Sequence, residues 1–158
     1  MLSPYNISAS SDNKSYEFET SSGDLYLAYF TEFSLTKPDG TELLIVCFGF
    51  SCHKAFTPTP VKIKYDPKIE LTIVFLINSF FKKNDENAIL YLCLNNDEKA
   101  KYRHRTFNRW FKNLDKDFIK HQIIANDFYG SILLQKSNPF KEEIISAFKY
   151  TVNIYWGI

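Results

Sequence analysis

The stretch that decides the fold runs from Ala88 to Leu114 and reads AILYLCLNNDEKAKYRHRTFNRWFKNL. Its first seven residues, Ala88–Leu94, are all apolar or aromatic, with Asn87 before them and Asn95-Asn96-Asp97 after them. A short run that is apolar on both faces is typical of a central strand. The Asn-Asn-Asp cluster offers side-chain oxygens to the N–H groups of a helix start, and Glu98 adds negative charge near its positive end. We therefore expect a buried strand that turns into a helix.

The expected helix has an apolar side and a basic side. Its apolar residues recur at spacings of three, four and seven and form one stripe facing a core: Ala100, Phe107, Trp110, Phe111 and Leu114. The far side holds Lys101, Arg105, Asn108, Arg109 and Lys112. Arg103 projects from the apolar stripe, where a guanidinium is rarely buried without a partner. It is expected to lie at the edge of the stripe, to pair with a carboxylate such as Asp97 or Asp127, or to face an anionic ligand.

Length and charge fit one ordinary domain, residues 1–158, with a local basic surface. A chain of 158 residues can bury a core without disulfides or metal, and the 15 Phe and 10 Tyr make that core aromatic. Six basic residues and no acidic residue lie between Lys99 and Lys112, which leaves 13 basic and 18 acidic residues elsewhere. The positive charge therefore lies on the expected helix, where it either forms a solvated face or holds an anionic partner.

Three cysteines, Cys47, Cys52 and Cys93, form no even disulfide framework and indicate reduced thiols in a cytoplasmic protein. The first residues show no pattern of a charged and then an apolar segment, so no export signal is expected. The most apolar window, Leu71–Phe81, is shorter than the about 20 residues that span a bilayer. We expect a cytoplasmic protein with no membrane contact.

Upstream of the central strand the sequence predicts an antiparallel meander. Residues 1–15 are polar and are expected to form a loose arm or a short edge strand. Tyr16–Thr20 and Leu25–Leu35 predict a hairpin, and Lys37-Pro38-Asp39-Gly40 has the chemistry of a tight turn into a third strand, Leu43–Phe50.

An irregular connection, His53–Tyr65, should follow the meander. Asp66-Pro67 then predicts a helix start, and Leu71–Phe81 is apolar almost all round, so this helix should be largely enclosed.

Downstream of the basic helix we expect a second hairpin and a last helix. Phe118–Asn126 and Ser131–Lys136 form the hairpin, with Phe128 and Tyr129 at its tip either as exposed aromatic contacts or folded back onto the core. Asn138-Pro139 should cap the helix, whose apolar stripe is followed by Gly157 as its end. The fold class is therefore α/β (α+β) with a mostly antiparallel sheet.

The order of these elements from Tyr16 to Lys136 resembles the later part of the GNAT-type N-acetyltransferase fold: meander, helix, strand, helix and two strands. That resemblance implies a coenzyme site at a glycine-rich turn before the first core helix. Here the corresponding segment, Lys54–Lys68, has no glycine. The family's asparagine, alanine and tyrosine on the second core helix are loosely matched by Asn96, Ala100 and Tyr102 at altered spacing.

A second resemblance rests on a short signature, which reads Tyr91-x-Cys93, Asp97 and Arg103-x-Arg105-x-Phe107-x-x-Trp110-Phe111. It is similar to small uncharacterised bacterial proteins of unknown function. This resemblance implies a grouping and no activity.

Other arrangements give weak signals. Cys47, Cys52 and His53 lack the paired spacing of a zinc site, so neither a metal site nor a cofactor is expected. His104 and His121 titrate in the range of general bases but have no partner motif, and we expect surface histidines.

The function expected from the sequence is a non-catalytic interaction module. Its binding residues are Lys101, Tyr102, Arg103, Arg105 and Arg109 on the basic helix. A protein partner is favoured over nucleic acid, because Trp110 lies on the buried stripe and the whole chain has a net charge of only +1. The alternative is a divergent GNAT-like acyltransferase without the usual glycine-rich coenzyme A loop.

Overall fold

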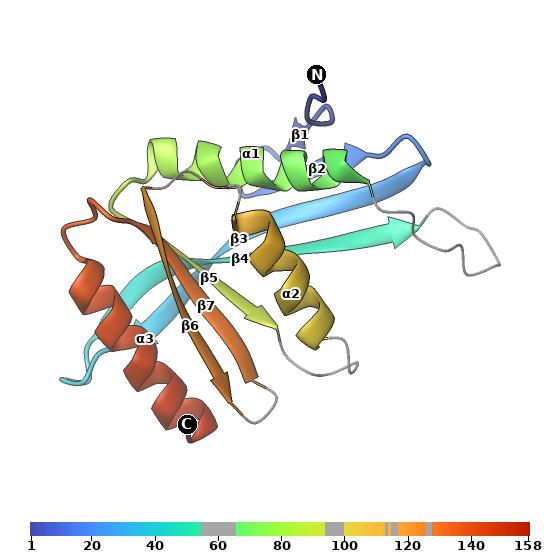
Figure 1. Ribbon diagram of the computed structural model, residues 1–158. Helices are drawn as coiled ribbons and strands as arrows, with labels where there is room; N and C mark the ends of the chain where they lie inside the picture. Colours follow the sequence, from blue (N-terminus) through green and yellow to red (C-terminus); the bar gives the residue numbers. More distant parts are fainter. Residues whose placement is uncertain (55–65, 94–99, 113, 115–116, 126–127) are drawn as a thin grey trace.

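The structure, a computed structural model, describes residues 1–54, 66–93, 100–112, 114, 117–125 and 128–158, without the side chains of His53 and Lys54. Within these residues the chain forms one seven-stranded sheet and three helices (Figure 1). In chain order the elements are β1 (Ser8–Ala9), β2 (Ser15–Glu19), β3 (Asp24–Thr36), β4 (Glu42–Lys54), α1 (Pro67–Lys83), β5 (Ala88–Cys93), α2 (Ala100–Phe111), β6 (Phe118–Ala125), β7 (Phe128–Gln135) and α3 (Lys141–Trp156). The expected mixed fold with a mostly antiparallel sheet is confirmed.

The predicted meander is present as β2, β3 and β4, which pair antiparallel in sequence order. The turn between β3 and β4 closes as its sequence predicts. Gly40 donates its N–H to the Lys37 carbonyl and takes a φ of 86°, and Asp39 accepts the Thr41 N–H. Only glycine adopts that angle readily, so this turn fixes the register of both long strands. β4 continues to Lys54, and the expected connection after it lies in residues 55–65, outside the described residues.

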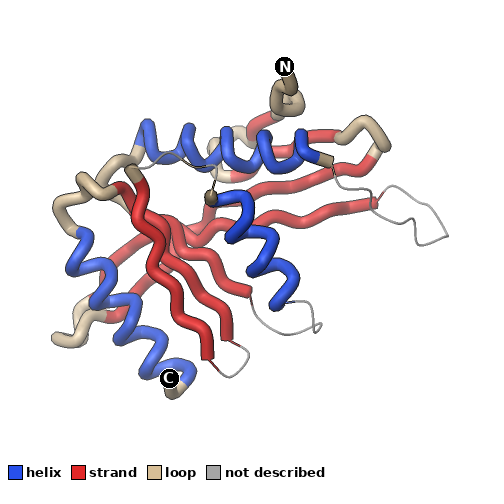
Figure 2. Tube along the Cα trace, viewed as in Figure 1, coloured by secondary structure: helices blue, strands red, loops and turns tan. Residues whose placement is uncertain are grey.

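Two apolar cores lie on the two faces of the sheet. Side chains of α1 and α2 pack on one face, around Phe48, Ile73 and Phe107. Side chains of α3 pack on the other face, around Leu90, Ile132 and Phe148. Figure 2 shows the three helices, in blue, lying against the strands, in red. α2 therefore has one side fixed to the sheet by aromatic packing and its other side available to solvent.

β5 is an internal strand, as predicted, between β4 and β7 in the order β1-β2-β3-β4-β5-β7-β6. Its pairing with β7 is antiparallel, whereas its pairing with β4 is parallel. The parallel ladder joins only Val46 to Ile89 and Cys47 to Leu90. Beyond it the two strands separate toward their carboxyl ends (Figure 1). The expected helix cap at Asn95-Asn96-Asp97 lies outside the described residues.

Helix α1 begins as predicted but is less enclosed than its sequence suggests. Asp66 accepts the Lys68 N–H as the N-cap, and Pro67 takes the first position. Leu71 is 36% exposed and Phe75 is 51% exposed, so the expectation of an enclosed helix is wrong. The reason is that α1 lies on one face of the sheet and no further described layer covers it. Its outer side chains face solvent although they are apolar.

The two ends of the chain are attached to the sheet and its helices. β1 pairs with β2 as a short edge strand, and Tyr5 donates its backbone N–H to Thr72 Oγ1 at 2.9 Å. α3 carries the predicted apolar stripe and ends at Gly157, which takes a φ of 66°. Asn138 Oδ1 accepts the Phe140 N–H just before the helix, but the N-cap residue is Phe140 and its side chain makes no cap hydrogen bond, so the predicted cap at Asn138-Pro139 is wrong. No helix within the described residues is long and apolar enough to cross a membrane.

Candidate functional site

Most of the binding residues predicted from the sequence are exposed on helix α2. Lys101, Arg105 and Arg109 are exposed, as is Lys112 directly after the helix, and Tyr102 is 69% exposed. The opposite side is buried through Ala100, Phe107 and Trp110. The prediction of which side of the helix faces solvent is confirmed for these residues. We call Lys101, Tyr102, Arg105, Arg109 and Lys112 the basic face.

Arg103 does not belong to this face. Its side chain is half-buried, and its positive charge acts on Tyr91 and Cys93 of β5. Two acids proposed as its partners, Asp97 and Asp127, lie outside the described residues. A half-buried side chain whose charge acts on β5 is compatible with each of the three arrangements expected for Arg103.

Tyr91 and Cys93 form a buried pair below Arg103. Burial raises the pKa of Cys93, and it does so against the opposing effects of the Tyr91 hydrogen bond and of the Arg103 and Lys120 charges. Burial is also the main cause that raises the pKa of Tyr91. Both groups are therefore held protonated near neutral pH. A protonated buried thiol is a poor nucleophile, so this pair is suited to packing and hydrogen bonding rather than to covalent catalysis.

The part of the chain around α2 also matches a known protein family. The match to the model of that family covers residues 65–150, more than half of the chain. The chain belongs to DUF6169, a family of unknown function. This confirms the grouping with an uncharacterised family. No curated protein and no solved structure matches the chain.

The DUF6169 match takes in α1, β5, α2, β6 and β7 and leaves out the meander. Every residue of the basic face and the pair Tyr91 and Cys93 lie inside it. The residues that β5 and α2 bring together therefore belong to the segment by which the family is defined.

His104 is a correction to the sequence-based prediction. It was expected at the surface, but it is 5% exposed and its ring centroid lies 5.0 Å from that of Tyr129. Asn108 Nδ2 lies 3.0 Å from His104 Nε2 and can donate to the neutral ring. Burial, helped by the charge of Lys120, lowers the pKa of His104. The ring is therefore a neutral, hydrogen-bonded residue on the buried side of α2, four residues after Ala100 and three before Phe107.

Asn108, placed on the solvent side by its spacing, is half-buried because it contacts side chains of α2 and β6. Its Nδ2 contacts His104 and also lies 3.4 Å from Gln122 Oε1 of β6. The Asn108 Oδ1 atom is buried and has no hydrogen-bond partner among the described residues. The three side chains link α2 to β6. No local sequence pattern predicts this contact between the two segments.

Lys120 is a further residue that the sequence did not single out. It lies on β6 at the side of α2, where its Nζ is 5.5 Å from the centre of the Phe111 ring. A pocket of about 320 Å³ opens beside it, lined by apolar side chains and by Asn108, Lys112 and Gln122. Burial lowers the pKa of Lys120 to about 8. The alternation Phe118-x-Lys120-x-Gln122 is the only signal that could have placed it there.

The expectation of exposed aromatic residues at the tip of the second hairpin does not hold. Phe128 and Tyr129 were expected as exposed residues at a hairpin tip, but both belong to β7, where Phe128 is 4% exposed and packs on Trp156. The hairpin turn is shorter than its sequence suggested, so these rings lie on the strand.

The cysteines cannot form a shared site. None of the three is disulfide-bonded. Cys47 and Cys52 are five residues apart on β4, so their side chains point to opposite faces of the sheet. No group of three His, Cys, Asp or Glu side chains within the described residues could hold a metal ion.

Proposed function

We propose that this DUF6169 domain is a non-catalytic interaction module that binds an acidic protein surface through the basic face of α2. The observation that carries the proposal is the exposure of Lys101, Arg105, Arg109 and Lys112 around the exposed Tyr102 ring. α2 contains no acidic residue that would neutralise this charge. The helix is fixed from behind by Phe107 and Trp110, so the basic face is presented on a rigid support.

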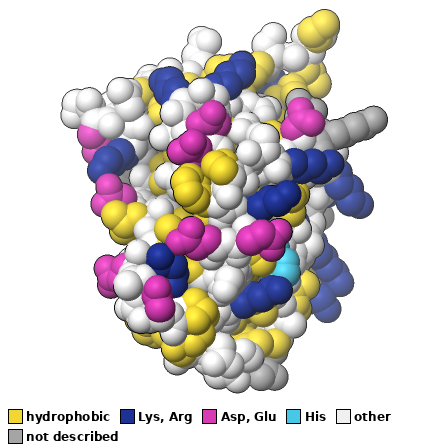
Figure 3. Space-filling model, turned by 90° about the vertical axis from the view of Figure 1, so that its left-hand side faces the viewer, with side chains coloured by type: hydrophobic (Ala, Val, Ile, Leu, Met, Phe, Trp, Pro, Cys, Tyr) yellow, Lys and Arg dark blue, Asp and Glu magenta, His cyan; other side chains and the backbone are white. Residues whose placement is uncertain are grey.

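The distribution of charge supports an acidic partner. Figure 3 shows one side of the molecule, on which acidic side chains are spread and Lys and Arg are most numerous toward the right-hand margin. Charge of the two signs is therefore unevenly distributed, and α2 itself carries basic residues and no acidic one. A local patch of one sign speeds association with a surface of the opposite sign. Tyr and Arg are also enriched at protein interfaces.

A protein partner fits this face better than nucleic acid does. Binding of single strands relies on several aromatic rings that stack on bases. Phe107 and Trp110 are buried, which leaves Tyr102 as the exposed ring of α2. We also propose that the domain works in the cytoplasm of a bacterium: its three cysteines are free, as thiols are in a reducing compartment, and its signature resembles small bacterial proteins.

Replacing Lys101, Arg105 and Arg109 together with Ala is expected to weaken binding of poly-L-glutamate by about tenfold at low salt, since exposed ion pairs contribute about 0.2–1 kcal/mol each. The wild-type affinity should fall as salt rises, and the variant should lose most of that dependence. Fluorescence anisotropy with labelled poly-L-glutamate measures both quantities.

The matched control replaces Lys14, Lys136 and Lys149 with Ala, which removes the same charge from exposed positions on other elements. Equal losses in the two triple variants would contradict the proposal. A 20-residue oligothymidine that binds more tightly than poly-L-glutamate, with the same sensitivity to the α2 substitutions, would identify a nucleic-acid site instead.

One observation favours a second candidate, a divergent GNAT-like acyltransferase. β4, α1 and β5 form a parallel crossover, so both strands end at the edge where α1 starts and where the chain leads into α2. Ligands of α/β sheets bind outside the carboxyl ends of parallel strands, and helix N-termini favour anions such as a pyrophosphate. The resemblance in element order puts a coenzyme at the same edge.

Two features weigh against this candidate. The segment Lys54–Lys68 has no glycine to bring backbone N–H groups close to phosphates. In addition, Phe50 of β4 packs against Trp110 at a centroid distance of 5.4 Å and against Phe107 at 6.2 Å. These rings fill the space beside β4 where it leaves β5.

Thermal unfolding with saturating acetyl-CoA separates the two candidates. The interaction module is expected to show no change in midpoint. An acetyl-CoA site occupied at about a hundred times its dissociation constant would add about 2.7 kcal/mol and raise the midpoint by a few degrees. Desulfo-coenzyme A and ATP serve as controls for general nucleotide binding. A rise specific to acetyl-CoA would replace the first candidate with the second.

A further inference from the structure

A second pocket lies away from α2, where helix α1 stops short of covering the sheet. α1 ends at Lys83, and Asn84 closes its last turn through its backbone N–H and its Nδ2, which both donate to the Phe80 carbonyl. The sheet continues beyond this end through β3 and β4. The uncovered part forms a pocket of about 480 Å³, within the size range of small-molecule sites.

The floor of this pocket is apolar and rigid. The Phe30 and Phe80 rings stack at a centroid distance of 5.1 Å with an interplanar angle of 3°. Tyr16 meets Phe30 edge-on at 5.9 Å, and Val46 lines the same floor. These rings come from β2, β3 and α1, so the floor is held by three separate elements.

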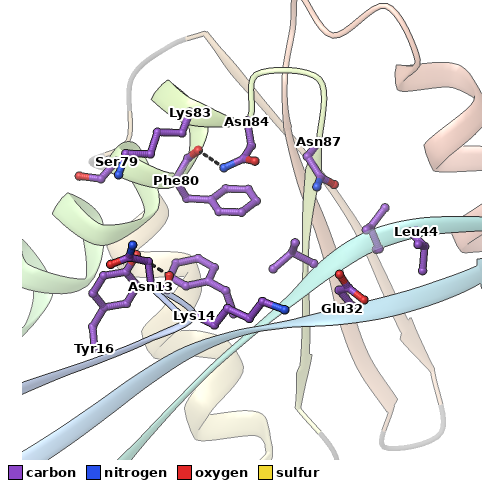
Figure 4. A pocket seen from close by; sticks show the side chains of 13 residues that line it. Asn13, Lys14, Tyr16, Glu32, Leu44, Ser79, Phe80, Lys83, Asn84 and Asn87 are labelled. Carbon is purple, nitrogen blue, oxygen red and sulfur yellow. Dashed lines mark hydrogen bonds between the residues drawn. The ribbon is translucent and has the colours of Figure 1, made fainter. Parts of the chain in front are cut away.

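The rim carries charges of both signs on separate elements. Lys14 precedes β2, Glu32 lies on β3 and Lys83 ends α1, and all three side chains are exposed. Figure 4 shows Lys14 and Glu32 on one side of the opening and Phe80 across from them. Among the described residues no ion pair joins any of these three charges to another group. The pocket therefore offers one anion and two cations to a ligand.

We propose that this pocket binds a free α-amino acid with an apolar side chain. Its ammonium group would meet the Glu32 carboxylate, its carboxylate would meet Lys14, and its side chain would pack against Phe80. A ligand with only a negative charge would be repelled by Glu32, and a ligand with only a positive charge would be repelled by Lys14. A zwitterion satisfies both, and the aromatic floor takes the apolar remainder.

This site is independent of the basic face and of the carboxyl ends of β4 and β5. Its strand residues Leu44, Ile45 and Val46 belong to the first half of β4, before or at the start of the parallel ladder. Part of it, from Asn13 to Val46, also lies outside the segment matched by the DUF6169 model. Binding there would make this chain a sensor of, or carrier for, an amino acid.

The test uses L-phenylalanine and two relatives that each lack one charge. N-acetyl-L-phenylalanine has no ammonium group, and L-phenylalaninamide has no carboxylate. L-phenylalanine is expected to bind the wild-type protein with a dissociation constant of about 0.1–1 mM, as ordinary ligand efficiencies give for its twelve heavy atoms. Each relative should bind at least about tenfold more weakly, because it leaves one rim charge without its counterpart. Chemical-shift titration of the full chain measures the affinities.

Variants of the rim then assign each charge. In Glu32→Gln, the affinity for L-phenylalanine should fall by about tenfold. N-acetyl-L-phenylalanine should then bind this variant as tightly as L-phenylalanine does. In Lys14→Met the same should hold for L-phenylalaninamide. Both residues are exposed, so the variants are expected to fold, and Glu17→Gln on the exposed opposite side of β2 is the matched control.

Three results would overturn the proposal. The first is the absence of binding by L-phenylalanine or L-leucine up to about 10 mM, well above the expected range. The second is binding that neither Glu32→Gln nor Lys14→Met changes. The third is tighter binding of a neutral sugar such as methyl glucoside, which would show that the rim acts through hydrogen bonds rather than charge.

Discussion

Replacing Phe107 with Ala is expected to lower the free energy of unfolding by about 3–5 kcal/mol, the usual cost of removing a fully buried phenylalanine. Phe107 is 1% exposed and stacks on Tyr91 at a centroid distance of 3.5 Å. It also contacts the rings of Phe48, Phe50 and Phe111. Few other side chains could collapse into the space it leaves, because the surrounding rings are held by three different elements.

Urea unfolding measures this loss as a lower midpoint with an unchanged slope. The matched control is Tyr102→Ala on the same helix, which is expected to change stability by less than about 0.5 kcal/mol because Tyr102 is exposed. Phe107→Leu should fall between the two. A loss below about 1 kcal/mol for Phe107→Ala would mean that α2 is not anchored through this ring, and the basic face would then lack the rigid support assumed for it.

The elements that could be predicted from the sequence are those fixed by local chemistry. The Pro38-Asp39-Gly40 turn closes through bonds between neighbouring residues, and the meander follows from it. The seven-residue run at Ala88 identified an internal strand because few other elements are short and apolar on both faces. The exposed side of α2 followed from its period, and with it most of the proposed site.

The errors share a different cause, since each depended on which layer covers a residue. Leu71 and Phe75 have the apolar character of core residues but lie on the side of α1 that no described element covers. His104 is polar but is buried because Tyr129 of β7 packs on its ring. Periodicity gives the direction of a side chain relative to its own helix and gives no information on what stands opposite it.

The amino-acid pocket could not have been found from the sequence for the same reason. Lys14, Glu32 and Lys83 are spread over about half of the chain and carry no motif. They converge because α1 crosses the sheet and ends above β3. A site assembled from the end of a helix and the middle of a strand requires the relative placement of both elements.

Replacing Lys120 with Met is expected to stabilise the protein by about 1 kcal/mol at pH 7. Burial lowers the pKa of Lys120 to about 8 from the ordinary 10.5, which means that folding disfavours its charged form. That difference corresponds to about 3 kcal/mol before screening, and to about 1–2 kcal/mol for a side chain that remains half-exposed. The cation–π contact between Lys120 and the Phe111 ring offsets about 0.5–1 kcal/mol of this cost. Methionine keeps the apolar contacts and removes the charge.

The advantage of Lys120→Met should depend on pH in a defined direction. Below pH 8 the lysine is charged in both the folded and the unfolded protein, so folding carries the full cost of burying the charge. Between pH 8 and 10.5 the folded protein has lost this proton and the unfolded protein retains it, so the cost of burying the lysine decreases progressively as pH rises. The difference in unfolding free energy between Lys120→Met and wild type should therefore be largest at pH 7 and shrink toward pH 10.5. The tyrosines and thiols ionise in both proteins, so their effect on the unfolding free energy cancels in this difference.

Urea midpoints at pH 7, 8, 9 and 10 measure the trend, with the exposed Lys136→Met as a control that should show no such pH dependence. A Lys120→Met protein that is less stable than wild type at pH 7 would show that the charge is stabilised in the folded state by a favourable interaction stronger than the Phe111 contact. A negatively charged ligand bound in the neighbouring pocket would also make Lys120→Met less stable than wild type at pH 7. In that case the advantage of wild type over Lys120→Met should grow as pH falls through 8, because only the protonated amine attracts an anion, whereas without such a ligand the advantage of Lys120→Met grows over the same range.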